Sequence, residues 1–262
     1  MELKISVLSK PGGRDVNQDA YGVWSSASAC FCVISDGAGG HTGGELAAKL
    51  AVKHVLETFY QTPEPSAQTL EAAMLAANQA IVTEQLRSPE VANMRATILV
   101  LAVDTAHGTA RWGHLGDTRL YCFRRKRILA QTRDHSVVQS MVDAGYLGAQ
   151  DIRAAPGRSA LLAALGDAEN FNPSIEASDF RIHDGDVFLL CTDGLWEYID
   201  EPAMERLLLA AETPEAWLRE LESEVLRLGH KGQDNYSAVV IWCLDPKEST
   251  LMQTLPPPAQ RP

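Results

Sequence analysis

The sequence predicts an α+β fold in which two antiparallel β-sheets pack as a β-sandwich and pairs of α-helices cover its outer faces (four layers, αββα). Strand-like and helical segments occur in separate blocks along the chain, which disfavours a doubly wound parallel sheet. About ten strand-like segments are present, more than one open sheet usually holds. Short turns join many of them, as is usual for antiparallel neighbours.

The expected strands are short apolar or alternating runs bounded by turn residues. Residues 29–35 are apolar on both faces, so we expect them at the centre of a sheet. In chain order the expected strands are residues 3–9, 20–25, 29–35, 97–103, 109–115, 119–124, 127–131, 161–165, 174–180, 187–191 and 236–244.

The expected helices are segments in which apolar residues recur every three or four positions. In the last of them Pro214 suits the first helical position, and Gly229 marks the end. Residues 145–160 have weak periodicity and are expected to form a mobile segment. The helices are expected at residues 46–60, 70–81, 137–142, 204–211 and 214–228.

Length and composition indicate one large folded domain. We place this domain at residues 1–244. The remaining residues, 245–262, are rich in proline and have little apolar surface to bury, so we expect a disordered tail.

The net charge of −11 argues against a nucleic-acid or membrane partner, because both surfaces are anionic. No apolar stretch approaches the roughly 18 residues that span a bilayer. The first ten residues are too short and polar for a signal peptide, so we expect a cytoplasmic protein. The five cysteines lie in apolar runs without C-x-x-C pairs, which favours buried thiols over disulfides or a zinc site.

Two apolar strands end in an Asp–Gly pair, in the stretches "VISDGAGGH" and "FLLCTDGLWE". The aspartates are Asp36 and Asp193. A carboxylate at a strand end is held firmly by the sheet, and the glycine allows a sharp turn that leaves its carbonyl uncovered. Such oxygen ligands suit Mg²⁺, Mn²⁺ or Ca²⁺. Since Asp–Gly is also a common turn, one such pair alone would carry little weight.

Two more acidic clusters lie near strand ends. "GRDVNQDA" contains Arg14 and Asp19, and "KGQDNYSAVVI" contains Asp234 and Asn235. Four carboxylates with one arginine could bind two divalent cations and a phosphate. The sequence contains no G-x-G-x-x-G, no G-x-x-x-x-G-K-[ST] and no H-E-x-x-H, so nucleotide-binding and zinc-protease motifs are absent.

Seven motifs in order carry a resemblance to a known family. They are "RDVNQD", "DGAGGH", "GHLGDTRLY", "TRDHSVV", "GRSALLAALG", "CTDGLWE" and "QDNYSAVVI". From about Leu3 to Trp242 the chain resembles the metal-dependent Ser/Thr protein phosphatases of type 2C, particularly compact bacterial members. The resemblance implies a β-sandwich flanked by helix pairs and makes residues 1–244 the catalytic domain.

The resemblance also implies a site for two Mn²⁺ or Mg²⁺ ions. Asp36 would bridge the two ions, and the carbonyl of Gly37 would touch one of them. Asp193 and Asp234 would hold the first ion. Asp19 would hold the second, partly through water.

Three further roles follow from the same resemblance. Arg14 would bind the phosphoryl oxygens through its planar fork. Asp117, in "LGDTR", would join Asp193 at a third, weaker metal site. Asn235 would support Asp234 from outside the ligand set.

The implied reaction is hydrolysis of phosphoserine and phosphothreonine in proteins. A water activated by the two cations attacks phosphorus in line with the leaving oxygen, without a covalent phosphoenzyme. The implied partners are phosphorylated proteins, such as a bacterial Ser/Thr kinase that phosphorylates itself or a forkhead-associated protein that the kinase phosphorylates. The phosphatase would reverse the action of that kinase. We expect a monomer.

The chain departs from the family pattern in two places. Ala38 stands where many eukaryotic members have a histidine proposed as general acid, so the acid is unidentified. His41 is nearby, although a structural role in the following loop is favoured for it. The usual Met-Gly-Thr-Thr run has Arg95 in place of glycine, which makes Arg95 a candidate anion contact. Residues 145–158 match the family's variable flap and could contribute to substrate choice.

Two alternatives remain open. Some proteins of this fold have lost metal ligands and act as binding modules, although all four principal aspartates are present here. A dimetal hydrolase of small phosphoesters or nucleotides is the other alternative.

Overall fold

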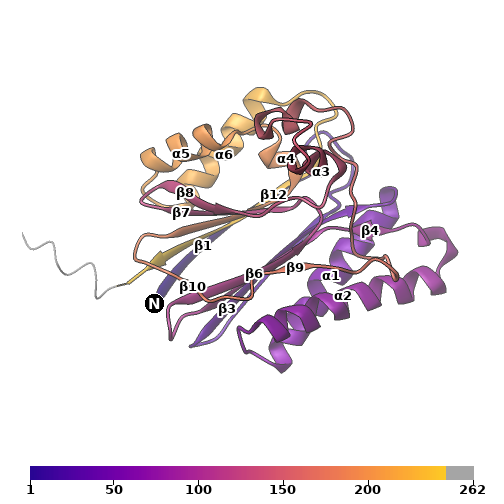
Figure 1. The fold of residues 1–262 in the computed structure, drawn as a ribbon, viewed down its shortest axis with the longest axis horizontal. Helices are drawn as coiled ribbons and strands as arrows, with labels where there is room; N and C mark the ends of the chain where they lie inside the picture. The colour runs from indigo at the N-terminus through magenta and orange to yellow at the C-terminus, as the bar shows by residue number, and fades with distance from the viewer. Residues whose placement is uncertain (246–262) are drawn as a thin grey trace, which may run out of the picture.

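The computed structural model describes residues 1–245 and consists of two stacked antiparallel sheets with a helix pair on each outer face (Figure 1). The predicted fold class is therefore confirmed. The five-stranded sheet has the order β1 (Glu2–Lys10), β12 (Tyr236–Leu244), β11 (Val187–Cys191), β7 (Arg119–Arg124) and β8 (Arg127–Gln131). The predicted tail begins at residue 245, and its residues from 246 onward lie outside the described part of the structure.

The second sheet is seven-stranded. Its main path has the order β10 (Phe180–Arg181), β6 (Thr109–Leu115), β5 (Ile98–Asp104), β3 (Ala29–Ala38) and β2 (Asp19–Ser25). Two short strands lie off this path: β4 (Arg95–Ala96) pairs with β3, and β9 (Ser174–Ile175) pairs with β6.

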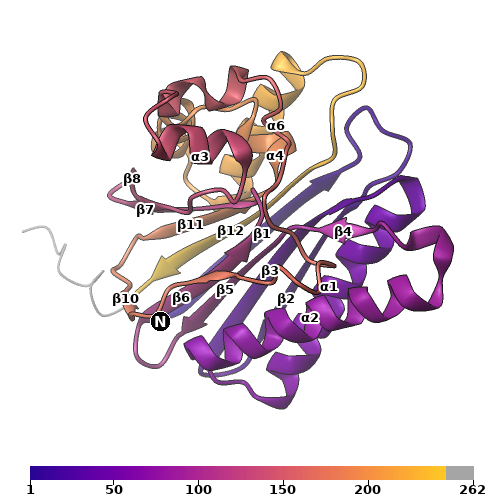
Figure 2. The same ribbon diagram turned by 45° about the vertical axis from the view of Figure 1, so that its right-hand side comes forward.

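The helix pairs cover opposite faces of the sandwich, as Figure 1 and the turned view in Figure 2 show. α1 (His41–Gln61) and α2 (Ala67–Arg87) pack on the seven-stranded sheet. α5 (Glu201–Ala210) and α6 (Pro214–Leu228) pack on the five-stranded sheet. None of the helices within residues 1–245 is long and apolar enough to cross a membrane.

Strand β3 shows how the apolar pattern builds the layers. Phe31 and Val33 belong to the apolar cluster under α1 and α2, whereas Cys30, Cys32 and Ile34 belong to the cluster between the sheets. Because successive side chains of a strand point to opposite faces, a strand between two packed layers is apolar throughout. All five cysteines are buried and free of disulfides, as predicted.

Side-chain caps fix where three of the helices begin. Ser66 accepts a hydrogen bond from the backbone N–H of Thr69 at the start of α2, at 3.2 Å. Asp200 and Thr213 accept equivalent bonds at the starts of α5 and α6. These caps satisfy backbone donors that a helix start leaves unpaired.

Two of the expected strands are wrong. Residues 161–165 form no strand and make only isolated bridges, from Leu161 to Ser136 and from Leu165 to Ala96. Residues 174–180 form the two short strands β9 and β10 instead of one. Both segments are connections that pass close to a sheet, so apolar residues alone gave a misleading strand pattern.

The length of the short link between β6 and β7 led us to expect a hairpin, but the two strands do not pair. The link carries the chain from the seven-stranded sheet into the five-stranded sheet. Gly116 enables this crossing with a φ of +107°, and Asp117 and Thr118 are buried there. This crossing places Asp117 at the end of the sandwich, between the two sheets.

The segment at 145–160 is more structured than its weak periodicity indicates. It follows α3 (Val137–Asp143) and contains the 3₁₀ helix η2 (Ala149–Ala154). Arg153 in this helix donates hydrogen bonds to the carbonyls of Trp196 and Ile199, at 2.8 and 3.3 Å. The segment is thereby attached to the chain that follows β11.

A buried ion pair links the five-stranded sheet to the short helix α4 (Asp193–Trp196). Arg119 donates two hydrogen bonds to Asp134, at 2.8 and 2.7 Å, and both side chains are only 3% exposed. The guanidinium also lies 3.5 Å from the centre of the Trp196 ring. Since α4 begins with Asp193, this cluster supports one of the predicted site residues.

Replacing Asp134 with asparagine should strongly destabilise the protein, because the buried Arg119 would lose its two carboxylate hydrogen bonds and keep only Glu201, 3.9 Å away, as a counter-ion. We expect a loss of about 3–5 kcal/mol in the free energy of unfolding. The control is Glu45→Gln, which removes an exposed pair with Lys49 and should cost less than about 1 kcal/mol. Chemical denaturation of both variants measures the difference, and equal losses would contradict this role of the buried pair.

Candidate active site

An open pocket of about 230 Å³ lies where the ends of the two sheets meet. It contains most of the residues that the sequence singled out. Its lining residues are Arg14, Gln18, Asp36, Gly37, Ala38, Thr97, Asp117, Ser159, Leu161, Asp193 and Asp234.

Asp36 lies within strand β3, whereas the sequence predicted that the strand ends there. The strand continues to Ala38, and β4 pairs with this extension. The backbone N–H of Asp36 donates to the hydroxyl of Thr97 at 3.0 Å, and its carbonyl accepts from the N–H of Thr97 at 2.8 Å. These bonds fix the backbone that carries the Asp36 carboxylate.

The glycines after both aspartates are explained by close packing and not by the sharp turn that the sequence predicted. A Cβ on Gly37 would lie 1.9 Å from the carbonyl oxygen of Gly44 in α1. A Cβ on Gly194 would lie 1.9 Å from the carbonyl oxygen of Asn235. Only glycine lets these backbone segments approach so closely, so each Asp–Gly pair locks a carboxylate against a neighbouring element.

The segment before β12 brings Arg14 and Asp234 together. Arg14 Nη2 lies 2.9 Å from Asp234 Oδ2, and both side chains are about half exposed. The side chain of Asn235 makes no hydrogen bond to Asp234. It accepts from the N–H of Gln18 at 2.8 Å and donates to the carbonyls of Pro11 and Val16. The Asn235 amide thus holds the loop that carries Arg14 and Gln18, while only its backbone N–H donates to Asp234.

Asp19 lies behind the pocket instead of lining it. On strand β2 it is the direct cross-strand partner of Asp36. Asp19 Oδ2 accepts a hydrogen bond from the Thr192 hydroxyl at 2.9 Å, whereas Asp19 Oδ1 is buried without a hydrogen-bond partner. The carboxylate is therefore oriented by the residue that precedes Asp193.

Asp117 is held by contacts on both sides of the crossing. Its carbonyl accepts a hydrogen bond from the Trp196 ring at 2.9 Å. The hydroxyl of the next residue, Thr118, lies 2.5 Å from the hydroxyl of Thr97, which in turn binds the backbone of Asp36. The positions of Asp117 and Asp36 are thereby linked.

The aspartates repel one another in a poorly solvated environment. Burial, followed by the charges of neighbouring carboxylates, raises the pKa of Asp36 and Asp193 well above the usual range. Burial raises the pKa of Asp19 and of Asp117 to about 7. Ionised carboxylates are therefore unfavourable here unless a cation neutralises them.

The donor set fits divalent cations with a preference for oxygen ligands. Asp19 Oδ1 and Asp193 Oδ1 are both buried without hydrogen-bond partners, as expected of atoms that bind a cation. Among the described residues, no three aspartate, glutamate, histidine or cysteine side chains form a group that could hold a metal ion as they stand.

Sequence reasoning missed four lining residues: Gln18, Thr97, Ser159 and Leu161. All lie inside or next to stretches that it had singled out, so motif membership was the available signal. Ala38 lines the pocket as expected. Arg95 does not line it, and its guanidinium donates to the carbonyl of Met94 at 2.9 Å. The side chain of His41 lies outside the described part of the structure.

A family model described as protein phosphatase 2C matches residues 12–226. The chain belongs to this family. It is similar to the serine/threonine protein phosphatase PstP of Mycobacterium tuberculosis, with 30% identity over 222 residues. That match covers 84% of this chain and 41% of the relative, so the chain spans less than half of that relative's length.

Two solved structures support the likeness in three dimensions. A crystal structure of the Mycobacterium tuberculosis serine/threonine phosphatase PstP/Ppp has a TM-score of 0.81 and 27% identity, covering 93% of this chain and 99% of that one. The catalytic domain of PstP in complex with two manganese ions has a TM-score of 0.78 and 28% identity, covering 93% and 99%.

The raised carboxyl pKa values predict how the metal-free protein responds to pH. Between the unfolded pKa near 3.8 and the folded value of about 7, folded Asp117 binds a proton that the unfolded chain does not. Stability should therefore rise as the pH falls. From about pH 8 to about pH 6.5 we expect the unfolding midpoint to rise by roughly 2 °C or more in the presence of a chelator.

The Asp117→Asn variant is the matched control, because it lacks this carboxyl and should show a smaller rise. Comparing the two proteins also cancels the contributions of His114 and His135. Their lowered pKa values make stability fall as the pH falls, opposite to the effect of Asp117. Identical pH profiles for the two proteins would contradict the crowding of charge at this site.

Proposed function

We propose that the chain is a metal-dependent protein phosphatase that hydrolyses phosphoserine and phosphothreonine, with residues 1–244 as its catalytic domain. The observation that carries the proposal is a cluster of carboxylates, two of which have a buried oxygen without a hydrogen-bond partner, beside a half-exposed arginine at an open pocket. The two manganese ions in the related PstP structure support the same chemistry.

Aspartates from both sheets would hold two Mn²⁺ or Mg²⁺ ions, and Asp117 with Asp193 would hold a third, weaker one. When bound, these cations supply a water of lowered pKa as the nucleophile and positive charge beside the phosphoryl oxygens. The residues proposed to contact the ions are Asp19, Asp36, Asp117, Asp193, Asp234 and the carbonyl of Gly37.

Arg14 would bind and orient the phosphoryl group. Its side chain is 54% exposed and its guanidinium pairs with Asp234 at 2.9 Å, which leaves donors available to a ligand. A planar fork of donors matches two phosphoryl oxygens and stabilises charge that develops on them. Asn235 contributes indirectly by holding the loop from which Arg14 projects.

The size of the pocket favours a phosphorylated side chain over a free nucleotide. At about 230 Å³ it is smaller than the 300–1,000 Å³ usual for pockets that enclose small molecules. None of the lining residues among those described is aromatic, so no side chain offers a platform for a base. A phosphoseryl or phosphothreonyl side chain that projects from a protein would reach the aspartates from the open side.

The wider setting of the reaction is also part of the proposal. Phosphoproteins in the cytoplasm of a bacterium would be the substrates, including a Ser/Thr kinase or a forkhead-associated protein in a signalling pathway. The net charge of −11 supports protein substrates over nucleic acid or membrane. We propose that the enzyme acts as a monomer.

Phosphate release from a phosphothreonine peptide tests the reaction. We expect turnover with Mn²⁺ or Mg²⁺, none with chelator, and a fall of more than about 100-fold for Asp193→Asn, since even groups that merely support metal ligands contribute about 10- to 100-fold. The control is Asp179→Asn, whose carboxylate is 60% exposed and pairs with Arg111 outside the pocket. Wild-type protein without turnover on several phosphopeptides would favour a binding module. Faster turnover of nucleotides would favour the small-phosphoester alternative.

Arg14→Ala should lower kcat/KM for the phosphopeptide about 10- to 100-fold, because a hydrogen bond to a charged group is worth about 1.5–3 kcal/mol. Arg14→Lys should recover only part of the loss, since lysine keeps the charge without the fork. The matched control is Arg87→Ala, at the exposed end of α2. Steady-state kinetics measure the effect. An Arg14→Ala enzyme with wild-type kcat/KM would remove Arg14 from phosphoryl binding.

A further inference from the structure

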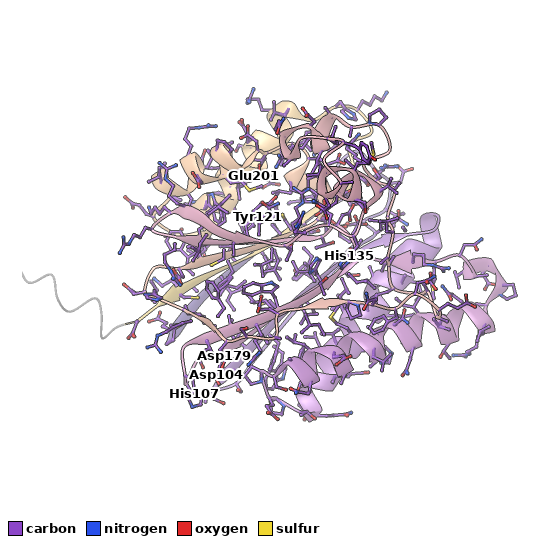
Figure 3. All side chains as sticks on the ribbon, in the orientation of Figure 1. Asp104, His107, Tyr121, His135, Asp179 and Glu201 are labelled. Carbon is purple, nitrogen blue, oxygen red and sulfur yellow. The ribbon has the colours of Figure 1, made fainter. Side chains whose placement is uncertain are left out.

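We propose that His135 is a positioning residue for the active site. One ring nitrogen of His135 holds the turn that carries Asp117, and its backbone carbonyl holds the segment that carries Leu161. The inference rests on the proposed function, because that function makes Asp117 a metal ligand and makes the pocket that Leu161 lines the active site. Figure 3 shows His135 between the two layers of the sandwich, at the opposite end from Asp104 and His107.

His135 satisfies both backbone groups of the residue before Asp117. The N–H of Gly116 donates to His135 Nδ1 at 3.2 Å, and the carbonyl of Gly116 accepts from the N–H of His135 at 2.9 Å. Gly116 has a positive φ and lies between β6 and β7, where its backbone has no partner strand. The imidazole therefore replaces a sheet hydrogen bond where the chain crosses between sheets.

On its other side His135 contacts the second segment of the pocket. Its carbonyl accepts a hydrogen bond from the N–H of Leu162 at 2.8 Å, and Ser136 forms a bridge with Leu161. Leu161 and Ser159 line the pocket. One residue thus connects the Asp117 turn to the segment that follows the flap.

The hydrogen bonds define which ring nitrogen carries the proton. Because the amide of Gly116 can only donate, His135 Nδ1 must be unprotonated, and the proton lies on Nε2, 2.9 Å from the Ser174 hydroxyl. The ring stacks on His114 with centroids 4.7 Å apart and an angle of 2° between the planes. His114 Nε2 in turn donates to the carbonyl of Arg133 at 2.8 Å.

The surroundings of the ring keep this acceptor available. Burial, together with the adjacent His114, lowers the pKa of His135 to about 4, while Asp134 acts in the opposite direction. The ring is therefore neutral throughout the neutral pH range, and Nδ1 can accept the Gly116 hydrogen bond.

Three substitutions separate positioning from simple packing. In His135→Asn, the side-chain oxygen can take the place of Nδ1. In His135→Gln, the longer side chain can reach Ser174, but it places no acceptor where His135 Nδ1 accepts from the Gly116 N–H. His135→Ala removes both. The matched control is His107→Ala, an exposed histidine that pairs with Asp104 far from the pocket.

The first readout is manganese affinity, measured by calorimetry and by the concentration that gives half-maximal phosphopeptide turnover. Loss of one neutral hydrogen bond corresponds to about 2- to 10-fold in an equilibrium constant. We expect that weakening for the Ala and Gln variants and near wild-type values for the Asn and His107→Ala variants. Asn and Gln variants that are equally impaired, or an Ala variant with unchanged affinity, would overturn the inference.

The second readout is hydrogen exchange of the Gly116 amide in metal-free protein, which needs no activity. This amide should be protected in wild type and His135→Asn and should exchange faster in the Gln and Ala variants. Equal protection in all four proteins would overturn the inference. A wild-type protein without phosphatase activity but with this exchange pattern would refute the proposed function alone.

Discussion

Mutual repulsion among aspartates, held close together by a rigid sandwich, is the constraint on which the site depends. Asp19 and Asp36 belong to the seven-stranded sheet, whereas Asp193 follows β11 and Asp234 precedes β12 in the five-stranded sheet. Asp117 lies on the crossing between them. The cluster therefore exists only where the two sheets stack, and the apolar layer between the sheets opposes its repulsion.

Threonine hydroxyls connect the two halves of the site. Thr192, after β11, donates to Asp19 on the other sheet, and the Thr97 and Thr118 hydroxyls link Asp36 to the Asp117 turn. The Thr192 bond orients the Asp19 carboxylate, and the Thr97 bonds fix the backbone that carries Asp36. None of them neutralises a carboxylate, so the charge is left for cations.

Much of this arrangement could be predicted from the sequence. Apolar periodicity gave both helix pairs and the central strand at residues 29–35. The aspartates at strand starts and ends included Asp36, Asp193 and Asp234 of the pocket, whereas Asp117 and the family came from the ordered motifs. These features succeed because they are local: a strand end, a turn residue or a helix face is recorded in neighbouring residues.

The remaining features depend on contacts between distant segments. The three-residue link at Gly116 looks like a hairpin turn, and nothing local distinguishes a hairpin from a crossing between sheets. Gly37 and Gly194 are required by the approach of Gly44 and Asn235, not by a turn. The place of Asp19 behind the pocket, and the role of Asn235 in holding the Arg14 loop, are likewise set only when the two sheets meet.

The most direct test of the account is a crystal structure of the protein grown with Mn²⁺, with anomalous scattering recorded at the manganese edge. The account predicts two strong peaks in the pocket, both within coordination distance of Asp36, with Asp193 and Asp234 beside one of them. No peak in the pocket, or peaks only at surface carboxylates elsewhere, would contradict the claim that these crowded aspartates are a cation site.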